Sequence, residues 1–361
     1  MIKVLSLAGT ARSIGRQHGE QVVDLRPYIQ ASMQTRLAVL RQQGVNLFPY
    51  LEEIIQIWQQ HAPATLEMLL GIAEALEFDW RDYLSYTIFP YLEGRINLIH
   101  RAVHQDQGCT TWAASGVFTH DGAPLLVKNR DNHPDQRPLQ CLAHVRPERG
   151  YPYLCLTTAG IPGVSSSGIN TVGLAVVDTY VASTDVGPGI GRYSVMMDLL
   201  EKCASVRDAI VYIRSHPHFG NGTVSLVDAQ GDMAVFEIAH SVLAVRHPNE
   251  GFVVSTNHFT APKTRTIWMD CEQPHLQGNS VERHGRVEKA LRAASGRVDI
   301  PWAQNLMAQH GTGLSAICRH AEIDPLGVTI SCVILLPRQA SIYVANGHPC
   351  QTPFELVRVA D

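Results

Sequence analysis

The sequence predicts an α+β protein, with a mostly helical N-terminal part followed by a region of strands and helices. In residues 12–42 helix-breaking residues are few, and apolar residues recur at steps of three and four. From Cys109 onward, short apolar or alternating runs stand between turn residues, which is typical of strands. This change of pattern divides the chain into residues 1–108 and 109–361, which we expect to form one integrated body.

The same spacing predicts further helices in the first part. It continues through residues 51–58 and 65–76, where Pro63 is a start signal. Asp79 is positioned to cap a short helix that runs to Leu84.

Seven runs in the second part read as strands: residues 125–127, 173–177, 223–227, 234–238, 251–255, 329–336 and 341–344. Helical patterns interrupt them at 194–215, 280–294 and 301–309. Ser205 and Asp208 have the spacing of a helix capping box. Strands interspersed with helices predict sheets covered by helices.

Composition excludes several classes of protein. The net charge is −4 and no block of Lys or Arg occurs, so a general nucleic-acid binder is not expected. Met1–Ala8 begins like a signal peptide, but its apolar stretch is short and Arg12 follows. No apolar run approaches the roughly 20 residues needed to cross a bilayer. We therefore expect a cytoplasmic protein without a membrane partner.

Cysteine and histidine usage predicts free thiols and no metal. The 8 cysteines are scattered without a C-x-x-C pair. His216 and His218 are the closest pair of histidines, but no acidic or cysteine ligand lies near them in sequence. We expect no metal and no bound cofactor.

Cys109 is the exceptional cysteine, because it stands in Gly108-Cys109-Thr110-Thr111 at the start of a strand-like run. A cysteine becomes a useful nucleophile when a base removes its proton. That base could be its own α-amine, which is free only if the bond after Gly108 is cut. Gly108 leaves its carbonyl sterically open to the thiol. The alternatives are a small buried side chain, or an uncleaved Cys-His hydrolase that uses His120, His133 or His258.

Further motifs follow Cys109 in order along the chain. They are Lys128-Asn129-Arg130-Asp131, the segment Gly168–Ala175 with Asn170, Ser255-Thr256-Asn257-His258-Phe259, Asn279-Ser280-x-x-Arg283-x-x-Arg286, Ile317-Cys318-Arg319-His320 and Gly347-His348-Pro349-Cys350. Together with Gly15-x-x-x-Gly19 and Gly71-Ile72-Ala73, they resemble the acyl-CoA:6-aminopenicillanic-acid acyltransferase family, a cysteine branch of the N-terminal-nucleophile hydrolases. The resemblance spans nearly the whole chain.

This resemblance implies a four-layer αββα N-terminal-nucleophile hydrolase sandwich with a helical N-terminal prosegment. It also implies autocatalytic cleavage between Gly108 and Cys109. Residues 1–108 would then be an α chain that stays as a partner of the catalytic β chain, residues 109–361. An oligomer remains open.

The resemblance also implies roles for single residues. Cys109 would be nucleophile and, through its new α-amine, base; Asp131 would hold that amine, and Asn257 would donate to the oxyanion. Asn170 and Arg319 are candidates for substrate contacts. Each has a structural alternative: Asp131 a turn, Asn257 a strand end, Asn170 a loop and Arg319 an ion pair.

The implied substrate is a small amide or an acyl-CoA, and the acyl group would pass through a thioester on Cys109. A CoA thioester would be a co-substrate rather than a cofactor. Hydrolysis and acyl transfer both remain open. A further alternative is a protein of the same fold that has lost catalysis and only binds its ligand. Candidates for the entrance of the site are Tyr180, Tyr193 and the loop at 187–191.

Overall fold

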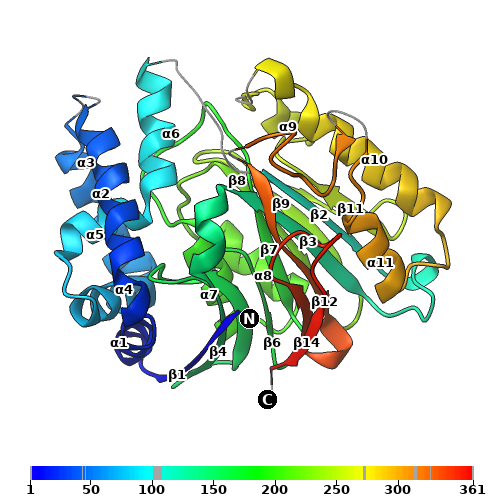
Figure 1. The fold of residues 1–361 in the computed structure, drawn as a ribbon, viewed down its shortest axis with the longest axis horizontal. Helices are drawn as coiled ribbons and strands as arrows, with labels where there is room; N and C mark the ends of the chain where they lie inside the picture. Colours follow the sequence, from blue (N-terminus) through cyan, green and yellow to red (C-terminus); the bar gives the residue numbers. More distant parts are fainter. Residues whose placement is uncertain are drawn as a thin grey trace.

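The computed structural model describes residues 2–42, 44, 46–100, 108–270, 274–311, 315–325 and 327–359. Two β-sheets lie face to face between layers of helices (Figure 1). This arrangement confirms the predicted αββα sandwich. Cys271 lies outside the described residues.

The larger sheet has eight strands and is mostly antiparallel. In spatial order they are β1 (Lys3–Gly9), β4 (Gln140–Pro147), β5 (Tyr153–Thr158), β6 (Ser167–Asn170), β7 (Ala175–Tyr180), β8 (Gly222–Val227), β9 (Met233–Ile238) and β10 (Leu243–Arg246). Only β1 runs parallel to its neighbour, β4.

The smaller sheet has six strands and is antiparallel throughout. In spatial order they are β11 (Phe252–Ser255), β2 (Gly108–Ala114), β3 (Leu125–Asn132), β12 (Val328–Leu336), β13 (Ser341–Ala345) and β14 (Glu355–Arg358). Cys109 therefore lies on an inner strand.

Helices cover the outer face of each sheet, as Figure 1 shows. Those packed with the eight-stranded sheet are α1 (Ala11–Gln21), α2 (Arg26–Gln42), α3 (Phe48–His61), α4 (Pro63–Ala75), α5 (Trp80–Thr87), α6 (Phe89–His100), α7 (Arg192–Lys202) and α8 (Val206–Arg214). Those beside the six-stranded sheet are α10 (Asn279–Ala293) and α11 (Ile300–Met307), while α9 (Pro262–Arg265) is a single turn. A third apolar cluster fills the space between the sheets.

The N-terminal part is not purely helical. Most of the Met1–Ala8 stretch, which begins like a signal peptide but is too short to be one, lies in β1, and β1 enters the sheet of the second part. The long helical pattern at residues 12–42 divides into α1 and α2 at the 3-10 turn Val23–Leu25. A side chain at Gly15 or Gly71 would collide with the backbone of the other helix, so these glycines let α1 and α4 pack closely.

Local signals in the second part behave as expected. Ser205 and Asp208 form the predicted capping box at the start of α8. The pattern at 194–215 nevertheless covers two helices, because the chain leaves α7 at Cys203 in an extended conformation. Within the described ranges, no helix is long and apolar enough to cross a membrane.

Candidate active site

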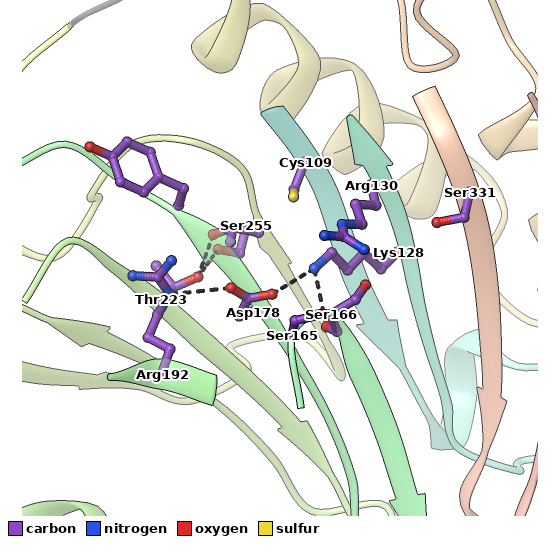
Figure 2. A network of polar contacts seen from close by, with 12 residues as sticks. Cys109, Lys128, Arg130, Ser165, Ser166, Asp178, Arg192, Thr223, Ser255 and Ser331 are labelled. Atoms are coloured by element: carbon purple, nitrogen blue, oxygen red, sulfur yellow. Dashed lines mark hydrogen bonds and ion pairs between the residues drawn. The ribbon is translucent and has the colours of Figure 1, made fainter. Parts of the chain in front are cut away.

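Cys109 is the second residue of β2 and is buried between the two sheets. Its register partner in β3 is Arg130. Side chains alternate along a strand, so Cys109 shares its face with Ala113, which belongs to the apolar cluster between the sheets. Figure 2 shows the sulfur directed toward Lys128 and Arg130. The thiol thus faces the interior of the sandwich.

Asn257 holds the backbone nitrogen of Cys109. The Cys109 N–H donates to Asn257 Oδ1 at 3.0 Å, and Arg283 Nη2 donates to the same oxygen at 2.8 Å. Because both partners are donors, the oxygen of the amide must face Cys109. Asn257 Nδ2 donates to the Tyr180 carbonyl at 2.8 Å, which leaves one of its two hydrogens for another acceptor.

Arg283 is a central residue of the site to which the sequence analysis gave no role. It is fully buried, and its Nη1 donates to the Cys109 carbonyl at 2.6 Å and to Thr110 Oγ1 at 2.9 Å. Asn279, one turn earlier on α10, accepts from its Nε at 2.7 Å. The Asn-x-x-x-Arg spacing places both side chains on one face of a helix, and that was the signal for it.

Asp131 and Arg319 lie against Gly108. A Cβ at position 108 would be 2.9 Å from Asp131 Oδ2 and 2.6 Å from Arg319 Nη1. Glycine leaves room for both groups beside the bond that precedes Cys109, whereas a larger residue would force one of these side chains to move. The predicted residues Gly108, Cys109, Asp131 and Arg319 are therefore brought together at one end of β2.

The two oxygens of Asp131 have different surroundings. Thr329 Oγ1 donates to Oδ1 at 2.6 Å. Oδ2 accepts no hydrogen bond from any described residue and has Arg319 Nη1 at 3.8 Å. Burial raises the pKa of the Asp131 carboxyl, while Arg319 and Arg283 act in the opposite direction. Arg319 also pairs with Asp324 at 2.5 Å, so it has a structural ion pair as well as its place in the site.

A second polar network lies below the thiol and joins the two sheets (Figure 2). Lys128 of β3 donates to Asp178 Oδ1 of β7 at 2.7 Å and to the Ser166 carbonyl at 3.1 Å. Arg192 Nε donates to Asp178 Oδ2 at 3.2 Å. The pair of Lys128 and Asp178 was not predicted, because the two residues become neighbours only when the sheets stack.

The thiol has no histidine base within the described part of the chain. Burial raises the pKa of the Cys109 thiol, and Lys128 only partly opposes this. His258 is bonded instead to Thr256 and Ser280, and burial lowers its pKa to about 3. His133 pairs with exposed Asp135. The backbone of His120 bonds to Val298 near the β2–β3 turn.

Asn170 belongs to the framework and not to this site. Its Nδ2 donates to the Leu200 and Cys203 carbonyls at 3.0 and 2.9 Å, and its Oδ1 accepts from the Leu174 N–H at 2.8 Å. The two Nδ2 bonds fix the end of α7 against the turn after β6, and the bond from Leu174 closes that turn. These contacts agree with the structural alternative for Asn170, and its substrate contact stays a prediction.

A cavity of about 540 Å³ opens between the N-terminal helices and the end of β3. Its wall combines residues of α2 and α6 with Asn132, Gln136 and Tyr180. A narrower pocket shares Arg36, Pro90, Asn132 and Gln136 with it and extends to Arg130, Ser165 and Tyr193. Tyr180 thus lines the larger cavity and Tyr193 the narrower pocket, which also reaches Arg130, the register partner of Cys109.

No residue of the loop at 187–191 lines either pocket. Trp58 Nε1 of α3 donates to the Gly189 carbonyl at 3.0 Å. A Cβ at Gly189 would lie 2.2 Å from the carbonyl carbon of His218. The loop is packed inside the protein, so the guess that it lines the mouth is not supported.

Comparison with known proteins identifies the family. The profile described as acyl-coenzyme A:6-aminopenicillanic acid acyl-transferase matches residues 117–351. The chain belongs to this family. Membership places it among enzymes that act on acyl groups. The matched region contains Asp131, Asn257 and Arg283 but begins after Cys109.

Two solved structures are similar to this chain at low identity. A conjugated bile acid hydrolase from Clostridium perfringens is 15% identical, with 69% of this chain and 97% of that chain covered at a TM-score of 0.44. A penicillin V acylase from Agrobacterium tumefaciens is 12% identical, with 70% and 87% covered at a TM-score of 0.45. No curated protein matches the chain in sequence.

Proposed function

We propose that this protein is a cysteine amidohydrolase or acyltransferase that first cuts its own chain between Gly108 and Cys109. The observation that carries the proposal is the free hydrogen-bonding capacity of Asp131 Oδ2, which lies against Gly108. A carboxylate oxygen in this position can accept a proton donor that exists only after cleavage, the α-ammonium of Cys109.

Cleavage would proceed through a thioester between the Gly108 carbonyl and the Cys109 sulfur. The Cys109 thiol attacks the Gly108 carbonyl carbon, and the acyl bond moves from nitrogen to sulfur as the nitrogen takes up a proton. Water then hydrolyses the thioester. The products are residues 1–108 with a new carboxylate, and residues 109–361 with a free α-amine.

The mature site would use that amine as the base. It lies where Asn257 Oδ1 already accepts from the Cys109 nitrogen, at 3.0 Å. The amine takes the thiol proton, sulfur attacks the substrate carbonyl, and the departing amine or thiol leaves protonated. The second Nδ2–H of Asn257 is our candidate donor to the oxyanion; such a donor contributes on the order of 3 kcal/mol.

The acyl acceptor distinguishes the two reactions. Water resolves the thioester on Cys109 to a free acid, while an amine resolves it to a new amide, and a CoA thioester would be an alternative acyl donor. The cavity of about 540 Å³ fits a small-molecule amide or thioester. Because α2 and α6 form one wall, residues 1–108 would stay bound and shape the substrate pocket.

Intact mass spectrometry of the purified protein tests the proposal. The wild type, 39.8 kDa in total, should appear as two chains of roughly 12 and 28 kDa by proportion. Cys109→Ala should stay full length and be inactive on amide and thioester libraries. Cys203→Ala, at a buried cysteine after α7, is the matched control and should mature normally.

Two results would contradict the proposal. A wild-type chain that stays intact after long incubation removes the self-processing step. Cleavage at the same bond in Cys109→Ala would mean that another group cuts the chain. An acyl adduct on Cys109 in an intact chain would instead support the uncleaved thiol hydrolase.

A further inference from the structure

Four side chains suited to a transition metal gather apart from the thiol of Cys109. They are His310, Cys318, His320 and Cys350, and one ligand atom of each lies within 4.8 Å of the others. His310 follows α11, Cys318 and His320 precede β12, and Cys350 follows β13. Distant parts of the sequence therefore meet at one end of the six-stranded sheet.

The spacing of these atoms agrees with a tetrahedral site. The distance from Cys318 Sγ to Cys350 Sγ is 3.7 Å, and that from Cys318 Sγ to His320 Nε2 is 3.6 Å. Zinc with ordinary Zn–S and Zn–N bond lengths separates two sulfurs by about 3.8 Å, and a sulfur and a nitrogen by about 3.6 Å. The third measured edge, His320 Nε2 to Cys350 Sγ, is shorter at 3.2 Å.

Neighbouring groups already orient the ligands. The rings of His310 and His320 meet edge to face, with centroids 4.8 Å apart. The His348 ring stacks on His320 at 3.9 Å. The Cys318 N–H donates to the Gln309 carbonyl at 2.9 Å, which fixes the backbone beside the first sulfur. A pre-arranged ligand set loses little conformational freedom on binding an ion.

We propose that His310, Cys318, His320 and Cys350 bind one Zn²⁺ ion in a structural site. Two thiolates and two imidazoles match the preference of zinc and not that of magnesium or calcium, which take oxygen ligands. Four protein ligands close the coordination sphere, as in structural zinc sites. His310 is exposed, so an ion can reach the site from solvent. No metal was expected from the sequence because only His216 and His218 were considered; Cys318 and His320 are two residues apart, but Cys350 lies 30 residues after His320.

The ion would also position Arg319. This residue stands between the ligands Cys318 and His320, and its side chain reaches Asp131 and Asp324. Zinc would thus fix the backbone on both sides of the guanidinium that lies against Gly108. Arg319 is a positioning residue in this account, and the metal takes no part in the acyl chemistry.

Metal analysis of untagged full-length protein from zinc-supplemented medium tests the proposal. We expect about one zinc per chain in the wild type and in Cys109→Ala, so the result does not depend on self-processing. Cys350→Ser and His320→Ala should lose the zinc, whereas Cys203→Ala should retain it. His310→Ala, at an exposed position, should fold normally and bind zinc at least tenfold more weakly.

Cobalt replacement gives a second readout of the ligands. Chelated protein refilled with Co²⁺ should show the visible bands of a tetrahedral site and thiolate charge transfer, and both should vanish in Cys350→Ser. Wild-type protein without zinc would overturn the proposal, as would zinc content unchanged in both ligand variants. A Cys318–Cys350 disulfide in freshly purified protein would also overturn it and identify a redox pair.

Discussion

Asp131 and Asp178 are two buried carboxylates near Cys109, and their partners differ. Asp178 lies between the sheets with Lys128 at 2.7 Å on one oxygen and Arg192 at 3.2 Å on the other. Asp131 lies at the end of β3 with Thr329 on one oxygen, while the other accepts no hydrogen bond from the described residues.

The number of cations already paired with each carboxylate decides which one can bind a newly formed ammonium group. The charge of Asp178 is already matched by two cations, so its role is to join the two sheets. Asp131 has the Arg319 guanidinium at 3.8 Å and only a weaker influence from Arg283, and its Oδ2, beside Gly108, accepts no hydrogen bond from the described residues. An ammonium formed at Cys109 would therefore find its acceptor in Asp131 and not in Asp178.

Asp131→Asn should have the largest effect on function. The amide can still accept from Thr329, so folding should survive, but the negative charge beside Gly108 is gone. We expect processing to stop and turnover of any matured protein to fall at least 10²-fold. Mass spectrometry and kcat/KM measure the two effects, with thermal melting as the control. A variant that matures and reacts like the wild type would remove Asp131 from the mechanism.

Asp178→Asn should lower the free energy of unfolding. It leaves Lys128 and Arg192 buried without their counter-ion, which costs about 3–5 kcal/mol. Urea unfolding measures this, and Asp24→Asn is the control, because its pair with Lys3 is exposed and contributes at most about 1 kcal/mol. Equal stability of both variants would refute the assigned role of Asp178.

Asn170 gives a smaller test of the difference between framework residues and site residues. Asn170→Ala removes three hydrogen bonds to backbone groups, so we expect a loss of about 2–3 kcal/mol in unfolding free energy. Its kcat/KM should stay near the wild-type value at temperatures where it is folded. A selective rise in KM without loss of stability would restore Asn170 as a substrate contact.

A third carboxylate extends the comparison to pH. Burial, with Asp198 acting in the same direction, raises the pKa of Glu201 from 4.5 to about 7. Between these values the native state holds a proton that the unfolded state has lost, so stability falls as pH rises. We expect a fall of about 3 kcal/mol from this group, and Glu201→Gln should flatten it. An unchanged slope in urea titrations across this range would exclude Glu201.

Much of the fold could be predicted because its signals are local. The run at 329–336 is β12, the pattern at 280–294 is α10, and Ser205 caps α8 as expected. β1 was missed because Lys3–Gly9 is short and its partner β4 lies more than a hundred residues later. A parallel pairing of this kind has no turn residues to indicate it.

Site residues could be predicted only where they belong to sequence motifs. Cys109, Asp131 and Asn257 were named from sequence, and the structure brings them together. The orientation of Asn257 was not predictable, because its oxygen faces Cys109 only through the donors Cys109 N and Arg283. The Lys128–Asp178 pair depends on how two sheets stack, which no spacing along the chain encodes.

Strand β1 has a consequence for how the enzyme could be recovered after damage. Lys3–Gly9 and β4 share one hydrogen-bonded ladder, yet cleavage after Gly108 would assign them to separate molecules. The uncut chain folds as a single molecule, at a rate independent of concentration. After maturation and denaturation, the two chains would have to associate before the sheet could form. Their rate of refolding would therefore fall on dilution. Maturation would thus replace a unimolecular folding reaction by one that depends on the association of two chains.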